Sequence, residues 1–522
     1  MLVKTFSASV QGLQASAVTI EVNATRGVRF VLVGLPDSAV KESYERIMAA
    51  LENSGYRFPS RSITINMAPA DVRKEGSGFD LPMAIGILAT EGTVDALTLN
   101  RYMMVGELSL DGSLQPIRGA LPISIKAREL GYEGLFVPEA NVREAAVVNN
   151  LNVYGVRHIN QVIGHLNGLE PMEPTIIDTR AEFYARQSEF EFDFADVKGQ
   201  EQVKRALEIA AAGGHNLIMI GPPGSGKSML AKRLPGILPP LSLRESLETT
   251  QIHSVAGKLQ TGSSLIAQRP FRSPHHTISQ VALVGGGANP QPGEISLAHN
   301  GVLFADELPE FQRSVLEVLR QPLEDRVINI SRAKYTITYP CSFMFIASMN
   351  PCPCGYYNHP DKQCCCTPGQ IVRYLNKISG PLLDRIDIHC EIQPVPFAQL
   401  SQMQPGEPSS VIRARVIKAR KIQEERFAYL HLEGGRAETV HCNAQMTERM
   451  LHRFAEPDNA SLNLLRMAME RLKLSARAYS RILKVARTIA DLAGSENVAS
   501  DHIAEAIGYR NLDRGDWAER GT

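Results

Sequence analysis

The sequence predicts an α/β protein with a wound parallel sheet, which an α+β domain precedes and a helical region follows. Residues 1–170 alternate strand-like and helix-like stretches, and a helical pattern takes over from about residue 441. Between them, four apolar strands separated in part by helical stretches indicate the sheet, at 216–220, 301–305, 335–339 and 342–348. A chain of 522 residues is too long for one hydrophobic core, so several domains are expected.

The composition is that of an ordinary soluble globular protein, with 44% apolar and 21% charged residues. Lys+Arg and Asp+Glu both total 55, so any contact with nucleic acid requires a local basic patch. No stretch is apolar for long enough to span a bilayer, and Met1–Val22 has no signal-peptide pattern. We therefore expect a cytoplasmic protein without a membrane partner.

The first domain is predicted to cover residues 1–170. Period-two or apolar strands are expected at 18–22, 28–33 and 63–67, with a helix from Asp37 to near Gly55. Residues 171–190 mix prolines with charge and lack periodicity, which predicts a linker.

The rest of the chain is predicted to hold a sheet core at 191–395, a basic insert at 396–440 and a helical region at 441–522. The charges of the helix expected within the insert, near 411–423, would face DNA or, more commonly, solvent. A later helix is predicted to end at Gly494, because apolar residues recur at three- and four-residue steps before it, at Ile482, Val485, Ile489 and Leu492.

The strand at 216–220 leads directly into a glycine-rich loop that matches the P-loop motif and precedes a helix. Backbone N–H groups of such a loop surround phosphate oxygens, and the helix directs its positive end at them. Lys227 would neutralise the β- and γ-phosphates of ATP, and the Ser228 hydroxyl would bind Mg²⁺. The predicted nucleotide-binding residues are Gly221, Pro222, Pro223, Gly224, Ser225, Gly226, Lys227 and Ser228.

Polar residues end the next two apolar strands. Asp306 is positioned to hold Mg²⁺, and Glu307 to polarise the attacking water. Asn350 would orient that water between the γ-phosphate and Glu307. In isolation, an acidic strand exit or an Asn before Pro351 is as easily a structural feature. Their order after the P-loop favours a hydrolysis site.

Five of the eight cysteines lie between residues 352 and 366. Clustering in a reducing compartment favours a metal site over disulfides. Cys352, Cys354, Cys364 and Cys366 are predicted to bind structural Zn²⁺ through four thiolates, with Cys365 surplus. The C-x-C spacing is tighter than usual for zinc, and free thiols in a surface loop are the alternative.

Long blocks around these motifs resemble the ComM/YifB family of magnesium-chelatase-like AAA+ ATPases, almost from end to end. The resemblance implies an AAA+ P-loop core with a C-terminal helical lid, assembled as a homo-oligomer, most simply a hexamer. The matching blocks are FRSPHHTISQVALVGGGANPQPGEISLAHNGVLFADELPEF (271–311), NPCPCGYYNHP (350–360), SGPLLDRIDIH (379–389) and LSARAYSRILKVARTIADLAG (474–494).

The resemblance also implies roles for arginines that spacing alone does not assign. Arg385 matches the arginine finger that reaches a neighbouring subunit's γ-phosphate, although a structural ion pair is the alternative. Arg477 matches the sensor-2 arginine of the lid, and Arg481, one turn on, is the competing candidate.

Two inserts of this family line the pore of the ring. The alternating residues 327–339 predict a hairpin with Arg332 and Lys334 at or near its tip, suited to DNA phosphates or simply exposed to solvent. The 79 positions between Lys227 and Asp306 exceed a short crossover, and the surplus matches a second insert near 284–287.

The first domain resembles the Lon-protease domain, a ribosomal-S5-like fold, at residues 67–82 and 106–119. Lon-type proteolysis needs a Ser activated by a Lys. Gly78 and Leu121 occupy these positions, and Ser77 lies one residue away from the first. The domain is therefore predicted to be non-proteolytic.

The function that the resemblance implies is an ATP-driven ring motor on single-stranded or branched DNA. It would act as a helicase or in branch migration, in natural transformation and recombination. The alternative is a metal-chelatase-type motor that remodels a protein partner.

Overall fold

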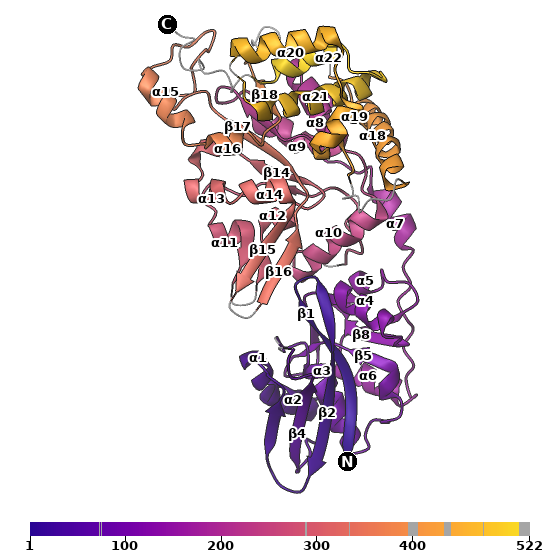
Figure 1. Cartoon of the computed structure of the whole chain (residues 1–522). Coiled ribbons are helices and arrows are strands. Elements are labelled where there is room, and N and C mark those ends of the chain that lie inside the picture. The colour runs from indigo at the N-terminus through magenta and orange to yellow at the C-terminus, as the bar shows by residue number, and fades with distance from the viewer. Residues whose placement is uncertain are drawn as a thin grey trace. The chain divides into compact units, whose positions relative to one another are not determined.

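The computed structural model describes residues 1–510 apart from positions 73, 75, 261, 288–289, 333–334, 395–405, 433–439 and 473. Of residues 332, 335 and 429–432 it describes the backbone only. The chain divides into two units, Met1–Arg186 with Ser242–Ala267 and Gln187–Leu241 with Gln268–Thr522 (Figure 1). Both units combine sheets with helices, so the predicted α/β class is confirmed.

The first unit contains a four-stranded sheet of order β1-β2-β4-β3 and a parallel sheet of order β5-β8-β9. Helix α3 (Asp80–Thr90) is buried along its whole length and packs on β1 and β2. The apolar alternation read in the sequence is confirmed, because Val18, Ile20 and Val22 face this core. The strands are β1 (Leu2–Gln11), β2 (Gln14–Thr25), β3 (Phe30–Val33), β4 (Ser62–Ala68), β5 (Tyr102–Met104), β8 (Gly134–Pro138) and β9 (Asn152–Val156), with a small pair β6 (Glu107–Leu108) and β7 (Leu114–Gln115).

The helix predicted to start at Asp37 is divided into two. The Asp37 carboxylate accepts the backbone N–H of Val40 at 2.8 Å and so caps α1 (Ser38–Lys41), and α2 (Ser43–Asn53) follows. The other α-helices of this unit are α4 (Ala120–Glu129), α5 (Val142–Ala145), α6 (Ile159–Leu166), α7 (Thr179–Arg186) and α10 (Leu243–Val255).

The boundaries of the two units differ from the predicted ones. The predicted linker 171–190 contains helix α7, and residues 242–267 from inside the predicted core belong to the first unit. Helix α10 packs on α4, and the Gly119 N–H donates to the Ser254 carbonyl at 3.1 Å. Periodicity reports that a segment is helical but carries no information on its packing partner.

The second unit is built on a five-stranded sheet of order β11-β14-β17-β10-β18, with every pair parallel. Three of the predicted strands are confirmed, and the strand predicted at 335–339 belongs to a separate hairpin. The sheet strands are β10 (Leu217–Ile220), β11 (Phe271–Arg272), β14 (Val302–Ala305), β17 (Met344–Met349) and β18 (Ile388–Glu391). Its helices before the lid are α8 (Glu201–Gly213), α9 (Lys227–Arg233), α11 (Gln280–Val284), α12 (Glu294–Leu297), α13 (Arg313–Glu317), α14 (Arg320–Asp325), α15 (Pro368–Leu375) and α16 (Gly380–Leu383).

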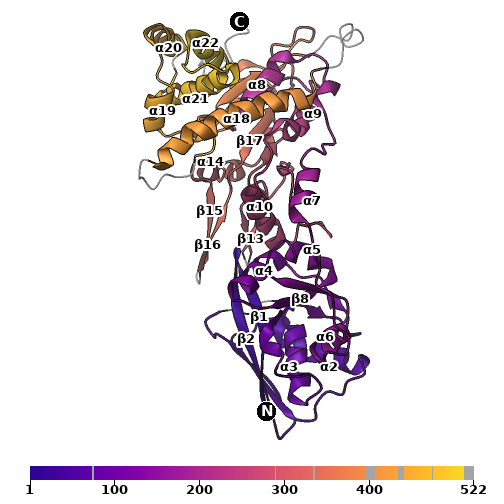
Figure 2. The same cartoon turned by 90° about the vertical axis from the view of Figure 1, so that its right-hand side faces the viewer.

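The C-terminal part is helical, as predicted, with α18 (Ser409–Leu432), α19 (Glu448–Phe454), α20 (Asn459–Leu472), α21 (Ala476–Ala493) and α22 (Ser500–Gly508). Gly494 ends α21 in the left-handed conformation that favours glycine, with φ +69°. Long helix α18 lies along α8 and α21 (Figure 2). Among the described residues, no helix is both long and apolar enough to cross a membrane.

The arginines of α18 have partners inside the second unit, although Arg415, Lys418 and Lys421 are exposed, as the solvent-facing alternative predicts. Arg415 pairs with Glu208 and Glu407, and Arg426 pairs with Asp491. Two more arginines donate to backbone carbonyls, Arg413 to Leu238 at 3.0 Å and Arg420 to Ala211 at 2.9 Å.

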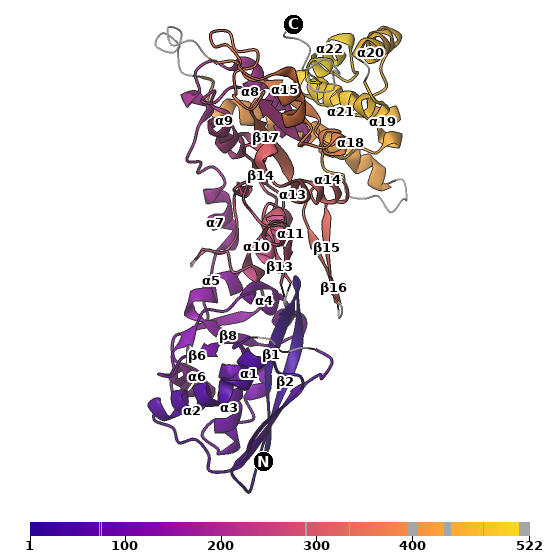
Figure 3. The ribbon, with the colours of Figure 1, turned by 90° about the vertical axis from the view of Figure 1, so that its left-hand side faces the viewer.

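The hairpin predicted at 327–339 is confirmed as antiparallel β15 (Val327–Arg332) and β16 (Tyr335–Pro340), which Figure 3 shows projecting from the sheet of the second unit. The region of the second predicted insert forms a small pair, β12 (Gly285–Gly286) and β13 (Gln291–Pro292). The Tyr339 hydroxyl donates to the Pro290 carbonyl at 2.9 Å, so the two inserts pack together.

Candidate active site

The P-loop emerges from the buried strand β10 at the carboxyl end of the sheet. Gly224 and Gly226 have φ of +77° and +88°, a left-handed conformation that a side chain would oppose. Gly226 is the N-cap of α9, so the end of the loop lies at the N-terminus of this helix, where backbone N–H groups can bind phosphate. The Gly221 N–H donates to the Met349 carbonyl at 3.2 Å, which ties the loop to the end of β17.

The Lys227 ammonium lies inside this loop. It donates to the carbonyls of Gly221 at 2.7 Å and Pro222 at 2.9 Å, and to the Asn350 amide oxygen at 3.3 Å. Burial lowers the pKa of Lys227, although Asp306 and Glu307 act in the opposite direction. The structure therefore brings Lys227 and Asn350, 123 positions apart, to one point.

Ser228 and Asp306 lie within hydrogen-bond distance, as a shared Mg²⁺ site requires. The Ser228 hydroxyl donates to one Asp306 oxygen at 2.7 Å, and the Ser348 hydroxyl donates to the other. Ser348 also accepts the Glu307 backbone N–H at 3.2 Å. A hydroxyl and a carboxylate are hard oxygen ligands of the kind that Mg²⁺ prefers, so this pair fits the ion. Sequence reasoning missed Ser348, because only the sheet places it beside Asp306.

Glu307 has a strained backbone, with φ +54°, and a side chain that is 56% exposed. A non-glycine residue in this region costs free energy, and such strain concentrates at functional sites. His276 Nδ1 lies 3.8 Å from a Glu307 carboxylate oxygen. His276 was also missed, although it belongs to the block at 271–311 that carries the resemblance.

The four cysteines predicted as zinc ligands come together, and Cys365 is exposed outside the cluster. Three Sγ–Sγ distances are 3.3 Å for Cys352–Cys354, 3.7 Å for Cys352–Cys364 and 3.5 Å for Cys354–Cys364. The ligand atoms of all four residues lie within 4.8 Å of one another. Tetrahedral Zn–S bonds of about 2.3 Å require sulfur separations of roughly 3.8 Å. The donor set and its spacing fit a structural zinc ion.

Arg385 is fixed at the opposite end of β10 from the P-loop. The Asn216 side chain, just before β10, donates to the Arg385 carbonyl at 2.9 Å and accepts the Phe345 N–H at 2.9 Å. The Arg385 guanidinium donates to the Pro381 carbonyl at 2.7 Å and pairs with Glu324, so the predicted alternative of an ion pair is present. Among the described residues, its buried Nε has no hydrogen-bond partner.

Arg477 and Arg481 have different surroundings, which separates the two sensor candidates. Arg481 donates to buried Asp387 at 2.9 Å, whereas Arg477, 68% exposed, pairs with Asp384 at 3.1 Å. Burial acts to raise the pKa of Asp387, but Arg481 and His215 outweigh it and hold that pKa below its usual range. Arg481 thus joins the lid to buried Asp387, and the Arg477 guanidinium is exposed apart from its ion pair with Asp384.

Both predicted catalytic arginines line one polar pocket of about 260 Å³. Arg385 and Arg477 share it with the cationic side chains of Arg481 and Lys484, and with the carboxylates of Glu324, Asp384 and Glu448. No residue of the P-loop is among the described residues that line this pocket. The structure therefore separates the arginines from the phosphate-binding group of the same chain.

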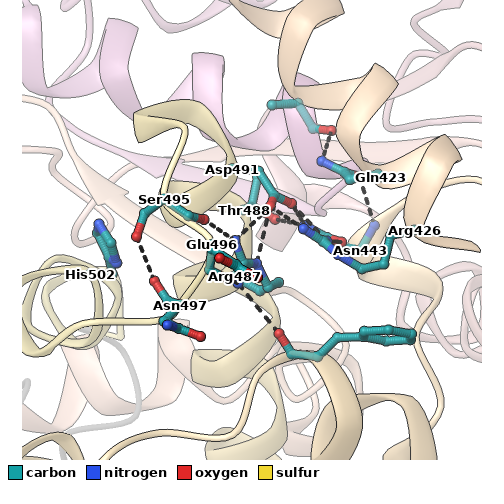
Figure 4. Close-up of polar contacts among 12 residues, drawn as sticks. Gln423, Arg426, Asn443, Arg487, Thr488, Asp491, Ser495, Glu496, Asn497 and His502 are labelled. Carbon is teal, nitrogen blue, oxygen red and sulfur yellow. Dashed lines mark hydrogen bonds and ion pairs between the residues drawn. The ribbon is translucent and has the colours of Figure 1, made fainter.

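A buried polar network holds the lid helices together (Figure 4). Asp491 on α21 accepts hydrogen bonds from Arg487 at 2.8 Å and from Asn443 at 2.8 Å, and it pairs with Arg426 of α18. Thr488, one turn before, contacts His215 at 2.8 Å. His215 lies directly before Asn216, so the lid is linked to the strand that opens the P-loop.

The predicted DNA contacts are only partly described. Arg332 ends β15 opposite Tyr335, so its backbone lies beside the tip of the hairpin. Lys334 lies outside the described residues. On one face of the hairpin, Ile328, Ile330 and Ile337 are buried, and the other face exposes Asn329, Ser331, Thr336 and Thr338.

In the first unit, neither position matched to the Lon dyad carries a nucleophile or a base. Gly78 precedes α3, and Leu121 is buried at the start of α4, where its N–H donates to Glu144 at 3.0 Å. The nearby Ser77 hydroxyl donates to the Glu107 carboxylate.

Three family descriptions of magnesium-chelatase subunits each match a part of the chain. The descriptions "Magnesium chelatase, subunit ChlI", "Subunit ChlI of Mg-chelatase" and "Magnesium chelatase, subunit ChlI C-terminal" match residues 193–400, 20–141 and 406–510. Competence protein ComM of Haemophilus influenzae is 44% identical over 513 residues, which cover 98% of this chain and 97% of ComM. YifB of Escherichia coli is 44% identical over 508 residues and 96% of each chain. Lon protease 2 of Bacillus subtilis is 32% identical over 157 residues, 27% of each chain.

Proposed function

Because the chain belongs to the ComM/YifB family of magnesium-chelatase-like AAA+ proteins, which implies ATPase activity with ATP and Mg²⁺, we propose that it is a ring motor acting on DNA. It would work as a helicase or in branch migration, during natural transformation and recombination. Haemophilus ComM is named a competence protein, which supports this assignment.

The position of Arg385 is the observation that supports assembly into a ring. Asn216 holds the Arg385 backbone at one end of β10, and the P-loop begins at Gly221 at the other end. The five residue-to-residue steps from Asn216 to Gly221 span roughly 16 Å in an extended strand, which is longer than an arginine side chain. Arg385 therefore supports hydrolysis most simply in a neighbouring subunit, as an arginine finger supplied in trans. A closed ring, such as a hexamer, gives every subunit this neighbour.

The two inserts support the proposal that the motor moves along DNA. Hairpin β15–β16 packs against the β12–β13 insert through Tyr339 and Pro290, which makes one projecting unit. Arg332 and Lys334 at its tip would contact backbone phosphates of single-stranded or branched DNA without reading the bases. A chain with no net charge needs such a local basic feature.

The alternative is a chelatase-type motor that remodels a protein partner. The three ChlI descriptions favour it, because they name a chelatase subunit. In that case the same inserts would engage a polypeptide, and DNA would not affect the rate.

We further propose that Cys352, Cys354, Cys364 and Cys366 hold a structural Zn²⁺. Four thiolates at tetrahedral spacing form a closed site, which leaves no position for a substrate and excludes a catalytic role for the metal. Such thiolates persist in a reducing compartment, in keeping with work in the cytoplasm.

An ATPase assay with different additions distinguishes the two proposed functions. The rate is measured with single-stranded DNA, forked DNA, protoporphyrin or casein present. We expect both DNA substrates to raise the rate and the other two additions to leave it unchanged. Stimulation by casein alone would favour the protein-remodelling function, and no response to DNA would contradict the DNA motor.

A further inference from the structure

The loop that carries the four cysteines begins directly after a residue of the hydrolysis site. Cys352 and Cys354 follow Asn350, whose amide oxygen accepts a hydrogen bond from the Lys227 ammonium at 3.3 Å. Any displacement of the first cysteine pair therefore acts on the strand end that presents Asn350.

The second cysteine pair is connected to the same residue through a helix. Cys366 directly precedes Thr367, the N-cap of α15, whose hydroxyl accepts the Gln370 N–H at 3.3 Å. Tyr374 on this helix is 6% exposed, and burial raises the pKa of its hydroxyl, whereas the backbone of Asn350 beside it acts to lower that pKa. Both ends of the cysteine loop thus converge on Asn350.

A third contact joins the loop to the P-loop itself. Gly355, with φ +83°, lies so close to Pro223 that an added Cβ would be 2.5 Å from the Pro223 Cδ. The Gly355 N–H donates to the Cys352 carbonyl at 3.0 Å, so this glycine belongs to the turn around the first cysteine pair. The turn and the P-loop touch without space for another atom.

Packing alone gives this loop little support. Residues 351–367 are described throughout and contain no helix or strand. Their apolar cluster has only Cys352, Tyr357 and Ile371 as buried members, and it is separate from the main core of the second unit. Ordering each residue costs about 1–2 kcal/mol of conformational entropy, which so small a cluster does not offset. A metal ion joining the two cysteine pairs is the constraint that remains.

We propose that the four-cysteine site is a brace for the hydrolysis site, through which bound Zn²⁺ sets the position of Asn350 and the packing of Pro223. In this proposal Zn²⁺ takes no part in the chemistry of ATP hydrolysis. It holds the two ends of the loop, so that Asn350 faces Lys227 and the γ-phosphate position. Removal of the metal leaves nucleotide binding to the P-loop and slows hydrolysis. The inference rests on the proposed zinc occupancy and on ATP hydrolysis, but not on DNA as the track.

The test compares Cys364→Ser with the adjacent control Cys365→Ser in the full-length chain. Cys365 is exposed and lies outside the cluster, and Ser at either position keeps the backbone N–H groups. Zinc per chain is measured after purification without chelator, and the Co²⁺-substituted protein is examined for thiolate-to-metal charge-transfer absorption. Binding of a fluorescent ATP analogue and kcat for ATP are measured without DNA.

We expect one zinc per chain in the parent and in Cys365→Ser, and loss of zinc and of the Co²⁺ bands in Cys364→Ser. A displacement of about 1 Å at a catalytic group costs up to roughly 10²-fold in rate, so kcat should fall between about 10- and 100-fold. The Kd for the ATP analogue should change less than about threefold, since only transition-state interactions are lost. Intact nucleotide binding also shows that the variant is folded.

A second variant tests the brace when the metal is present. Tyr374→Phe keeps the helix and the cysteines but removes the hydroxyl that contacts Asn350, and kcat should fall about 3- to 10-fold with zinc retained. A parent protein without zinc overturns the metal site. A Cys364→Ser protein that lacks zinc and turns over at the parent rate overturns the brace. Loss of DNA stimulation with these results unchanged contradicts the DNA motor only.

Discussion

Replacing Lys227 in one population of subunits and Arg385 in another tests whether the catalytic site is shared. Lys227→Ala removes the cation that lies inside the P-loop, within 2.9 Å of the Pro222 carbonyl. Arg385→Ala removes the guanidinium at the far end of β10. Each variant alone should be nearly inactive, because arginine fingers contribute about 10³- to 10⁵-fold to kcat.

Mixed rings should recover activity by a predictable amount. In a 1:1 mixture, half of the subunits carry an intact P-loop and half of their neighbours carry an intact arginine. About a quarter of the interfaces therefore hold both, whatever the ring size. The mixture should hydrolyse ATP at about a quarter of the parent rate per chain, if the sites turn over independently.

The assay is steady-state ATP hydrolysis after subunit exchange, with mixed rings verified by mass. Lys227→Ala mixed with Asp306→Asn is the matched control, because both changes damage the same side of the interface. That mixture should stay inactive. If verified mixed rings of Lys227→Ala and Arg385→Ala show no turnover, the shared site is refuted. If the control mixture recovers activity, the assignment of Lys227 and Asp306 to the same side of the interface is refuted.

Three further predictions concern the base, the hairpin and the lid. Glu307→Gln should still bind ATP but hydrolyse it about 10²- to 10⁴-fold more slowly, and near-normal hydrolysis would move the base elsewhere. Arg332→Ala with Lys334→Ala should weaken the salt dependence of binding to single-stranded DNA, so that the slope of log K against log salt becomes shallower by about 1.4. Fluorescence anisotropy at several salt concentrations measures this slope, and an unchanged slope would show that the tip does not contact DNA. Asp491→Ala leaves buried Arg487 without its carboxylate (Figure 4), and it should destabilise the lid by about 3–5 kcal/mol. Hydrogen exchange across α18 and α21 measures this loss of stability, which should be larger than the loss caused by Asn443→Ala. Equal losses would contradict the inference that the unpaired charge of Arg487 causes the destabilisation.

Local sequence was sufficient wherever a motif is contiguous. The P-loop between β10 and α9, the strand ends at Asp306 and Asn350, and the hairpin β15–β16 lie where the pattern predicted them. Even the choice among five cysteines agreed, since Cys365 lies outside the cluster. Contiguous patterns report backbone geometry directly, because glycine, apolar alternation and ligand spacing act over a few residues.

Other parts were not predictable from local patterns. Helix α10 was assigned to the sheet core, yet it belongs to the first unit with α4. The α18 arginines pair with acids and backbone carbonyls of the second unit, and the charge pattern gave no indication of these partners. No local pattern paired His276 with Glu307 or Ser348 with Asp306, since these partners lie tens of residues apart in the chain. A charge or a helix in sequence does not specify its partner.

The sequence by itself determined the α/β core and the P-loop within it, because short-range steric and hydrogen-bonding rules define the P-loop and the strands around it. Only the tertiary structure decided that Arg481 pairs with buried Asp387 and Arg477 with Asp384, and that Arg385 lies at the opposite end of β10 from its own phosphate loop. It also decided that Tyr374, on the helix after the cysteine loop, lies beside Asn350, which precedes the loop. These features depend on contacts between segments far apart in the chain, which form only when the sheet brings the segments together.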